Sequence, residues 1–600
     1  AGGIYGTIAA TSGKNTISDN LTCEEITVNG TAAAASAKNG TLTDRASLQE
    51  KQTYMELGWL FDLEWEMTEE NYPIPKVFSY PDEAVARVTA TLKDGGAGFS
   101  WYGKAQEAAR VKISGHADMS DPQKTEASAE ETDGGFRYTA DVSGLKADTR
   151  YYYQVYTGGD TSETGTFRTA KDSGAFTFVN LAGTDSGSLN ETAVAADTMR
   201  VALDTCDEAA FLLHSGSMVD ASRGQEAWKE LFFQAKETFL KVPVAPTVGL
   251  EGAEVMLDQF NIGDSGYYSF DYSNAHIVVL NTSEDAEQCV SGEQIEWLKA
   301  DVEEARADGA EWIILSVNKG PYTTGPSADS PEVAGLRTVL LPVIDELEID
   351  LVLQGQDHIL GRTCSVKDGK ADTSEYMEMV NGKRFYYSIS DEGTVYFMPG
   401  QAGVNMDTQL SAMTTEELDE YLALFSRSEQ RGSASNPTQT FASVTVDGAK
   451  LTVCTYERKN TDTATMIEAF GIDHAVNRVE QLIAESKWEE AREAYDLLND
   501  AQKDAVGNYY LLLEAENEEI QENKGAWLDK EAAERRSILL RNDTFSAFKD
   551  APVRLEIENA PSKVMKFYTT RGEELPADIE SYEKDGTSIV WVKVPDIESN

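Results

Sequence analysis

Two residues in the middle of the chain carry side chains that could coordinate a divalent metal. Asp185 stands in the phrase LAGTDSG and His358 in the phrase LVLQGQDHILGRT, each shortly after an apolar run. Carboxylate and imidazole groups are the ligands of catalytic transition metals such as zinc. Two places before His358, however, stands Gln356, whose amide is a poor substitute for a second imidazole. The sequence therefore raises the question of whether a metal site is present or has been lost.

The segment that carries these residues has the pattern of a layered α/β domain. Between residues 171 and 470, short apolar runs such as FTFVNLAG, HIVVLNTS and EWIILSVN alternate with amphipathic stretches. The clearest predicted helix is GEQIEWLKADVEEARADG, in which Ile295, Leu298, Val302 and Ala305 share one face. We expect strands and helices to alternate along this segment.

Five phrases in this segment occur in the order found in a known family. They are YYSFDYSNAHIVVLNT, EQIEWL, NKGPYTTG, GQDHILGRT and GTVYFMPGQAG. In this respect the segment resembles the calcineurin-like metallophosphoesterases, and the purple acid phosphatase branch most closely. The resemblance implies an α/β/β/α sandwich and two metal ions about 4 Å apart, bridged by a carboxylate, with a metal-bound hydroxide that attacks phosphorus.

The resemblance also assigns the metal-ligand positions. The family's first aspartate falls on Asp185 and its last histidine falls on His358. The other ligand positions fall on Ser217 (the bridging aspartate), Leu250 and Glu251 (the asparagine and histidine of the GNH phrase), Asn318 (the histidine before KGPY) and Gln356 (the first histidine of GHxH). A neutral hydroxyl is a poor bridge between two divalent ions, and a leucine side chain has no atom that can coordinate a metal. The glycines of the same phrases, Gly216, Gly249 and Gly355, are kept. The sequence therefore predicts a retained fold without catalytic residues, metal or other cofactor.

An alternative keeps a single metal ion on Asp185, Glu251 and His358, with Ser217 orienting a water molecule. Three protein ligands suffice for a mononuclear catalytic site. Against this alternative, Leu250 would add apolar bulk beside the metal. The chain also has few histidines that could bind a metal, because only His358 of the five stands in one of the family's ligand phrases. His214 and His276 lie in apolar, strand-like runs, which is typical of structural histidines.

The segments before the α/β domain have the sequence pattern of β-strands. Residues 1–75 contain short β-prone runs and end in YMELGWLFDLEW…YP, a phrase that resembles the end of the β-helix in bacterial surface adhesins; its aromatic residues Trp59, Phe61 and Trp65 are expected in the core. Residues 76–170 contain six strand-like runs bounded by turn residues, which predicts a β-sandwich. This segment resembles a fibronectin type III module, with Trp101 as the core tryptophan.

The segments after the α/β domain have first a helical and then a strand-like sequence pattern. Residues 471–525 carry three apolar stripes at helical spacing and resemble the three-helix modules of Gram-positive wall proteins, with Asp473 and Asp500 near two helix starts. Residues 526–600 return to strand texture and resemble a β-sandwich module that is cut short, with Phe567 and Trp591 in its core.

Composition limits the partners. The formal charge of −52, from 103 acidic and 51 basic residues, repels polyanions, so nucleic acid is not expected as a partner and phosphorylated substrates would need a local cationic or metal site. No apolar run is long enough to span a membrane. The five cysteines, Cys23, Cys206, Cys289, Cys364 and Cys454, form no CxxC pair and are expected to act as small hydrophobic residues.

These features together predict a non-catalytic binding protein. The chain is expected to be a piece of a secreted, wall-attached bacterial protein that binds a host macromolecule such as a glycan, a matrix protein or an immunoglobulin. The helical module or the segment 403–436 is expected to present the contact face. A phosphoesterase with a single metal ion and a structural spacer are the alternatives. Partners and substrates are assigned here by fold-level analogy alone.

Overall fold

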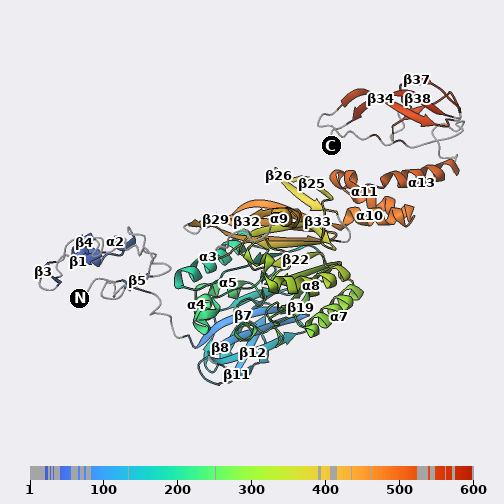
Figure 1. Ribbon diagram of the computed structural model, residues 1–600. Coiled ribbons are helices and arrows are strands. Elements are labelled where there is room, and N and C mark those ends of the chain that lie inside the picture. The colour runs from blue at the N-terminus through green and yellow to red at the C-terminus, as the bar shows by residue number, and fades with distance from the viewer. Residues whose placement is uncertain are drawn as a thin grey trace. The chain divides into compact units, whose positions relative to one another are not determined.

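The computed structural model (Figure 1) divides the chain into two compact units, described separately below. The first unit contains residues 1–363, 395–444 and 455–467, and the second contains residues 364–394, 445–454 and 468–600. The structure describes residues 21–23, 27–28, 31–32, 41–55, 65–67, 73–75, 83–132, 134–250, 252–389, 393–405, 415–433, 436–459, 461–522, 538, 540, 548–560, 562–569, 574–584 and 586–597.

Residues 85–169 form two antiparallel sheets that share a core. One sheet has the order β11-β12-β8-β7, and the other has the order β10-β9-β13-β14, with β15 also pairing with β13. The bounds are β7 Val85–Lys93, β8 Gly96–Gly103, β9 Ala109–Ser114, β10 Gln123–Glu126, β11 Ser128–Thr132, β12 Gly135–Ser143, β13 Arg150–Thr157, β14 Asp160–Thr161 and β15 Gly165–Arg168. Trp101 is fully buried between the sheets, as predicted, and its Nε1 donates to Thr157 Oγ1 at 2.9 Å.

Two further sheets form the α/β part of the first unit. The first has the order β18-β17-β16-β31-β32-β33, in which β16, β17 and β18 are parallel. The second has the order β19-β20-β21-β22-β27-β23, parallel from β20 to β27, and β28 also pairs with β23. The bounds are β16 Phe176–Leu181, β17 Leu212–His214, β18 Val244–Pro246, β19 Tyr268–Tyr272, β20 Ala275–Val279, β21 Trp312–Val317, β22 Leu351–Gln354, β23 Leu360–Lys367, β27 Thr394–Pro399, β28 Phe425–Glu429, β31 Gln439–Asp447, β32 Lys450–Arg458 and β33 Thr465–Asp473.

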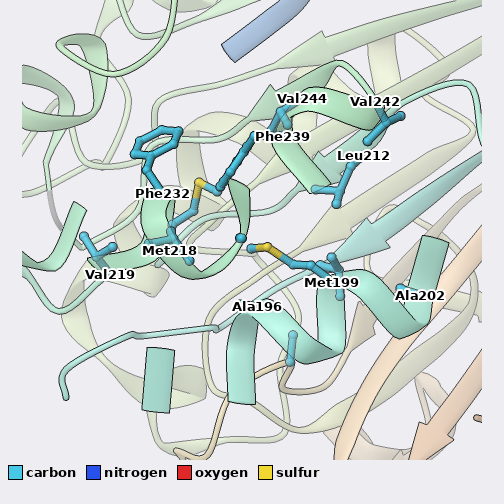
Figure 2. Close-up of a cluster of buried hydrophobic side chains, with 14 of the residues drawn as sticks. Ala196, Met199, Ala202, Leu212, Met218, Val219, Phe232, Phe239, Val242 and Val244 are labelled. Carbon is cyan, nitrogen blue, oxygen red and sulfur yellow. The ribbon is translucent and has the colours of Figure 1, made fainter. Parts of the chain in front are cut away.

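Helices pack against these two sheets. The helices of this part are α3 Leu189–Thr205, α4 Gln225–Gln234, α5 Lys236–Lys241, α6 Ala253–Leu257, α7 Gly292–Asp308, α8 Pro331–Glu346 and α9 Thr415–Leu422. Figure 2 shows Met199 of α3 and Met218, after β17, in the same apolar cluster as Phe232 of α4 and Phe239 of α5. The predicted apolar face of α7 is confirmed, because Ile295, Leu298, Val302 and Ala305 are all buried. The expected alternation of strands and helices is therefore present.

The two parts of the first unit are joined by hydrogen bonds to one segment, residues 258–261. The buried Arg87 of β7 donates to Gln259 Oε1 at 3.1 Å, and Tyr102 of β8 donates to the carbonyl of Asp258 at 3.0 Å. Arg137 of β12 donates to the carbonyl of Phe260 at 2.9 Å. Side chains of three strands of one sheet therefore fix the segment that precedes β19.

His276 is a structural histidine, as predicted. Its buried ring on β20 lies between two carboxylates, with Nδ1 2.7 Å from Asp271 Oδ1 and Nε2 2.9 Å from Asp301 Oδ2. Burial alone would lower the pKa of His276, but the hydrogen bonds to Asp271 and Asp301 outweigh burial and raise the pKa to about 9. His214 differs, because complete burial lowers its pKa to about 3 and keeps its ring neutral.

The stability of the first unit should depend on the protonation of His276. Because its pKa is about 9 in the folded chain and about 6.5 in an unfolded one, its contribution is complete below about pH 6.5 and is lost as the pH rises through 9. We expect the wild-type chain to lose about 3 kcal/mol relative to a His276→Gln variant between about pH 6.5 and pH 10. Melting temperatures over this range measure it, with His116→Gln, at an exposed histidine, as the control. Parallel pH profiles of wild type and His276→Gln would contradict the assignment.

The second unit contains further strands and a group of helices. In it β26 Lys383–Ser388 pairs with β25 Glu375–Val380 and with residues 470–472 of β33, and β24 Lys370–Asp372 pairs with residues 365–367 of β23. The helices are α10 His474–Ala484, α11 Trp488–Leu497, α12 Asp500–Ala505 and α13 Tyr509–Glu522. Four helices, rather than the predicted three, occupy this segment, because Asn499 caps the short α12 with a capping box. Asp473 and Asp500 both lie at helix starts as predicted, with Asp473 as the cap of α10 and Asp500 as the first residue of α12.

Two expectations for the second unit are wrong in detail. Trp488, assigned to an apolar stripe, is 36% exposed at the start of α11, and Trp591, assigned to a core, is 39% exposed. Trp591 lies on β38 Thr587–Ile597 between the buried Val590 and Val592, so the alternation of the strand turns its ring outward. In the sheet β34-β38-β37, β34 is Phe548–Glu558 and β37 is Ala577–Ser581; the short pair β35 Phe567–Tyr568 and β36 Glu574–Leu575 leaves Phe567 half-buried.

The remaining expectations concern the beginning of the chain and the cysteines. The short elements there are β1 Leu21–Cys23, β2 Thr27–Val28, β3 Thr31–Ala32, β4 Thr41–Thr43, α1 Arg45–Leu48, α2 Lys51–Met55, β5 Trp65–Met67 and β6 Pro73–Pro75, with β1 parallel to β4. Trp59 and Phe61 lie outside the described residues, and the β-helix end stays a prediction. Cys289 is buried as expected, whereas Cys206, Cys364 and Cys454 are half-buried. Within the described residues, no helix is both long and apolar enough to cross a membrane.

Candidate functional site

The residues singled out by sequence gather where four parallel strands end. Loops after β16 and β17 are joined by hydrogen bonds from Asp185 N to Ser217 O at 2.9 Å and from Gly183 N to Gly216 O at 3.3 Å. Loops after β21 and β22 are joined in the same way, because Gln356 N donates to Asn318 O at 2.9 Å. The carboxyl ends of parallel strands are the usual location of ligand sites in α/β folds.

The backbone of these loops turns sharply at the predicted positions. Asp185, Ser217 and His358 all have positive φ, at 38°, 57° and 47°. Such values are uncommon for residues other than glycine and concentrate at functional sites. Gly216 has a φ of 93°, and a Cβ there would lie 2.5 Å from Asn318 Nδ2, so both its turn and its contact favour glycine. The loop shapes are those of a site that presents side chains to a common point.

Asp185 and His358 are in direct contact. Asp185 Oδ2 lies 2.6 Å from His358 Nε2, and the two side chains are only 13% and 12% exposed. Gly183 permits this arrangement, because a Cβ at that position would lie 2.2 Å from His358 Cδ2. The structure thus brings together the two residues that carry competent ligands. The contact is close in distance, although Asp185 Oδ2 has no hydrogen-bond partner of normal geometry among the described residues.

Ser217 and Asn318 belong to a neutral hydrogen-bond network. Asn318 is fully buried, and its Nδ2 donates to Ser215 O at 3.1 Å and to Ser217 Oγ at 3.4 Å. Since a carbonyl oxygen can only accept, the contact with Ser215 fixes the orientation of the amide. The side chain therefore directs N–H groups, which cannot bind a cation, toward Ser217.

Further buried polar residues, which the sequence analysis did not single out, extend this hydrogen-bond network. Ser215 Oγ accepts from Asn180 Nδ2 at 2.9 Å and from Ser316 Oγ at 3.3 Å, and Ser316 Oγ lies 2.8 Å from Thr247 Oγ1. These four residues are completely buried. A signal was present, because each is a polar residue in or at the end of an apolar strand run, where an unsatisfied polar group would be costly.

Gln356 is held by the loop that follows β21. Its Nε2 donates to Ser327 Oγ at 2.9 Å, and Ser327 Oγ donates in turn to Asp357 Oδ1 at 2.6 Å. Asp357 Oδ2 also accepts from Ser327 N and from Thr323 Oγ1, both at 3.0 Å. Asp357 was not predicted as a site residue, and it positions the loop around Gln356. The amide nitrogen of Gln356 is therefore used in a hydrogen bond to this loop.

The last two predicted positions are Leu250 and Glu251, of which the structure describes only Leu250. Leu250 lies in the turn after β18, and its side chain is 53% exposed, so it is directed largely to solvent. Its predicted apolar bulk at the centre of the site is therefore not present in this arrangement. Glu251 lies outside the described residues.

The donor set can be compared with the dinuclear centre that the fold family implies. A bridge between two ions needs a carboxylate, and Ser217 supplies a hydroxyl that accepts a hydrogen bond from Asn318. Asn318 Oδ1 and Gln356 Oε1, which form no hydrogen bond in the described part of the chain, are neutral amide oxygens. No group of three or more His, Cys, Asp or Glu side chains is placed to hold a metal ion among the described residues. These residues do not form the donor set of a dinuclear centre.

Comparisons with known proteins define the class of fold. Residues 85–169 match the family described as the purple acid phosphatase N-terminal domain. The solved purple acid phosphatase PPD1 from yellow lupin (Lupinus luteus) seeds is similar over 65% of this chain and 74% of its own, with a TM-score of 0.53 and 15% sequence identity. The chain therefore has a phosphatase-like fold of the metallophosphoesterase type. This confirms the fold expected from the five phrases, while the resemblance of the sandwich to fibronectin type III stays a prediction.

Two curated relatives give a further point of reference. The uncharacterized proteins Rv2577 and MT2654, from two strains of Mycobacterium tuberculosis, are 24% identical to this chain over 311 residues, which is 45% of this chain. The match spans 58% of the length of each of these relatives. The names of these two proteins state no activity. The match therefore shows a relationship in sequence and gives no information about chemistry.

Proposed function

We propose that this chain is a non-catalytic binding protein built on a phosphatase-like scaffold. The observation that supports this most directly is the state of the bridging position. Ser217 stands there, and Asn318, at a terminal ligand position, donates an N–H to it at 3.4 Å. Because this hydroxyl and this amide N–H already form a hydrogen bond with each other, binding of a shared metal ion would require that hydrogen bond to break. The scaffold would be kept for its shape and its loops.

The charge of the chain supports the same proposal. A net charge of −52 repels anionic substrates, and a phosphatase overcomes such repulsion with metal ions or local cations. Around the paired Asp185 and His358, the residues at the other described ligand positions are neutral. A phosphate ester would therefore meet little compensating positive charge at this site.

The place of action and the partner are proposed from the companion segments. We place the protein at a bacterial cell surface, secreted and attached to the wall, and assign it a host macromolecule as partner: a glycan, a matrix protein or an immunoglobulin. The support is the sequence resemblance of residues 1–75 and 471–525 to segments of adhesins and wall proteins. In the described part of the segment 403–436, Tyr421 of α9 donates to Thr323 O at 2.8 Å, which ties α9 to the loop after β21.

A second candidate is a phosphoesterase with one metal ion. The contact between Asp185 and His358 favours it, because the two residues share one site and could close on an ion together with Glu251. A structural spacer that holds another domain away from the wall is a third candidate. Truncated fragments that retain no affinity for serum, matrix or mucus components would favour the spacer over the binding protein.

Metal content and turnover distinguish the first two candidates. The whole chain is incubated with Fe, Zn or Mn, desalted, and measured by elemental analysis and by hydrolysis of p-nitrophenyl phosphate. We expect substoichiometric metal, and hydrolysis that does not change in an Asp185→Ala variant. One tightly held ion per chain, together with turnover that disappears in Asp185→Ala but persists in a Ser222→Ala control at an exposed serine, would contradict the proposal.

A further inference from the structure

The outer face of the sheet β10-β9-β13-β14 carries an unusual row of cations. On β9, Arg110 and Lys112 alternate with the buried Val111 and Ile113, so the two cations point away from the core of the sandwich. On β13, Tyr152, Gln154 and Tyr156 occupy the same face, because they alternate with the buried Tyr153, Val155 and Thr157. Lys124 of β10 completes the row. We call these six residues the cationic face.

The strand register places like charges directly opposite one another. Lys112 pairs with Lys124 across β9 and β10, whereas Arg110 lies opposite Glu126 on β10 and Tyr156 on β13. Directly opposed like charges destabilise an antiparallel pair. Within the described residues, none of Arg110, Lys112 and Lys124 forms an ion pair with a carboxylate, and Arg110 Nε has no hydrogen-bond partner. The pairing of Lys112 with Lys124 is therefore unfavourable for the isolated fold.

Both cations of β9 converge on the ring of Tyr156. Lys112 Nζ lies 3.8 Å from the ring centroid and Arg110 Cζ lies 5.3 Å from it. The Tyr156 hydroxyl donates to Gln154 Oε1 at 2.8 Å, and Gln154 Nε2 donates to Thr164 Oγ1 at 3.0 Å. Cation–π contacts and these hydrogen bonds order the long side chains before any partner arrives. The cationic face is thus pre-organised as well as charged.

This face is also open. Lys124 is exposed and the other five residues are half-buried. Among the described helices and strands, the extensive contacts of β9 and β10 are all with other strands of the sandwich. In a chain with twice as many acidic as basic residues, a face with three such cations and a single carboxylate in its rows, that of Glu126, is a local exception to the expected repulsion of anions.

We propose that the cationic face binds an acidic polysaccharide, one that carries carboxylate or sulfate groups along an extended chain. Two neighbouring strands, about 4.8 Å apart, offer cations in successive rows for a polymer that crosses them. The ring of Tyr152 offers an apolar face for a sugar ring, and Gln154 offers the second N–H of its amide to hydroxyl groups. A polypeptide of acidic residues would use the cations but would offer neither sugar rings to Tyr152 nor rows of hydroxyl groups to Gln154, which favours a glycan. This inference rests on the binding role proposed above and names the chemistry of one partner.

The test measures binding of the whole chain to chondroitin sulfate, with neutral dextran and poly-glutamate as comparison polymers. We expect binding to chondroitin sulfate that weakens with added salt, no binding to dextran, and a loss of affinity of about tenfold or more in Lys112→Glu/Lys124→Glu. The matched control is Lys104→Glu/Lys146→Glu, which makes the same charge change at two exposed lysines of the sandwich outside the cationic face and should bind as the wild type does.

Three outcomes would overturn the inference. These are an absence of binding to chondroitin sulfate, equal loss in the test and control variants, and equally tight binding to poly-glutamate, which would identify a surface for acidic polypeptides. Melting curves of both double variants establish that the sandwich remains folded. Because metal content and turnover are measured separately, a failure here is distinguishable from a failure of the non-catalytic proposal.

Discussion

Replacing Gly355 by alanine is expected to destabilise the α/β part of the first unit by about 4 kcal/mol. A Cβ at Gly355 would lie 1.8 Å from the carbonyl oxygen of Ser215 and 2.7 Å from its carbonyl carbon. Both atoms belong to the backbone just after the end of β17, so the loop after β22 cannot accept the methyl group without moving away. That movement would break the hydrogen bonds from Gly355 N and Gln356 N to Asn318 O.

A matched control lies in the same phrase of sequence. A Cβ at Gly361 would come no closer than 3.9 Å to any neighbour, so Gly361→Ala should change stability by less than about 1 kcal/mol. Urea unfolding followed by tryptophan fluorescence measures both variants. If Gly355→Ala unfolds at the same denaturant concentration as Gly361→Ala, the close approach of the two loops is wrong.

Replacing Asp473 by alanine is expected to destabilise the second unit by about 3 kcal/mol. The buried Asp473 carboxylate accepts from Ala475 N at 2.9 Å as the cap of α10, and from Gln502 Nε2 at 2.8 Å. It also accepts from the hydroxyl of Tyr376 on β25. Loss of a cap costs about 1 kcal/mol, and leaving the buried hydroxyl of Tyr376 unsatisfied costs about 1–3 kcal/mol.

The control for this variant is Asp500→Ala. Asp500 is the exposed first residue of α12, whose cap is Asn499, so its replacement should cost less than about 0.5 kcal/mol. Hydrogen exchange of the α10 amides reports on the second unit alone. Equal protection of these amides in the two variants would contradict the role assigned to Asp473.

The outline of the fold could be predicted because several independent signals agree. Apolar strand runs, the amphipathic face of α7 and the turn glycines each fix a local conformation, and their order along the chain restricts the topology. Gly216 illustrates this, since both its positive φ and its contact with Asn318 require a residue without a side chain. Sequence could therefore place the loops of the site.

The internal contacts of the site could not be predicted in the same way. Asn318 follows β21, whereas Ser215 and Ser217, to which it donates, follow β17. These two strands belong to different sheets and lie far apart in the sequence. Which of their polar residues meet depends on how the two sheets pack, and no local pattern of residues encodes that packing.

The exposed tryptophans show a related limit. Trp488 and Trp591 were assigned to cores because large aromatic residues are usually buried, yet each is more than a third exposed, at 36% and 39%. In a strand, the face of a residue is set by its neighbours, and Val590 and Val592 already occupy the inner face of β38. Composition predicts which residues prefer burial, whereas register decides which of them achieve it.

The loop conformations of the site do not depend on metal coordination. Asp185, Ser217 and His358 all have positive φ, although only two of the three could serve as metal ligands, so the turns do not depend on coordination. A phosphatase-like scaffold can therefore carry a paired acid and imidazole beside a neutral amide network. The proposed binding role uses the outer surfaces of the scaffold, of which the cationic face is one.

The most direct measurement is an anomalous difference map from crystals of the whole chain soaked in Mn²⁺ or Zn²⁺. The proposal predicts no pair of peaks about 3.5–4 Å apart between Asp185 and His358, because Ser217 provides no carboxylate to bridge them. Two strong peaks at that separation, flanking Ser217, would contradict it.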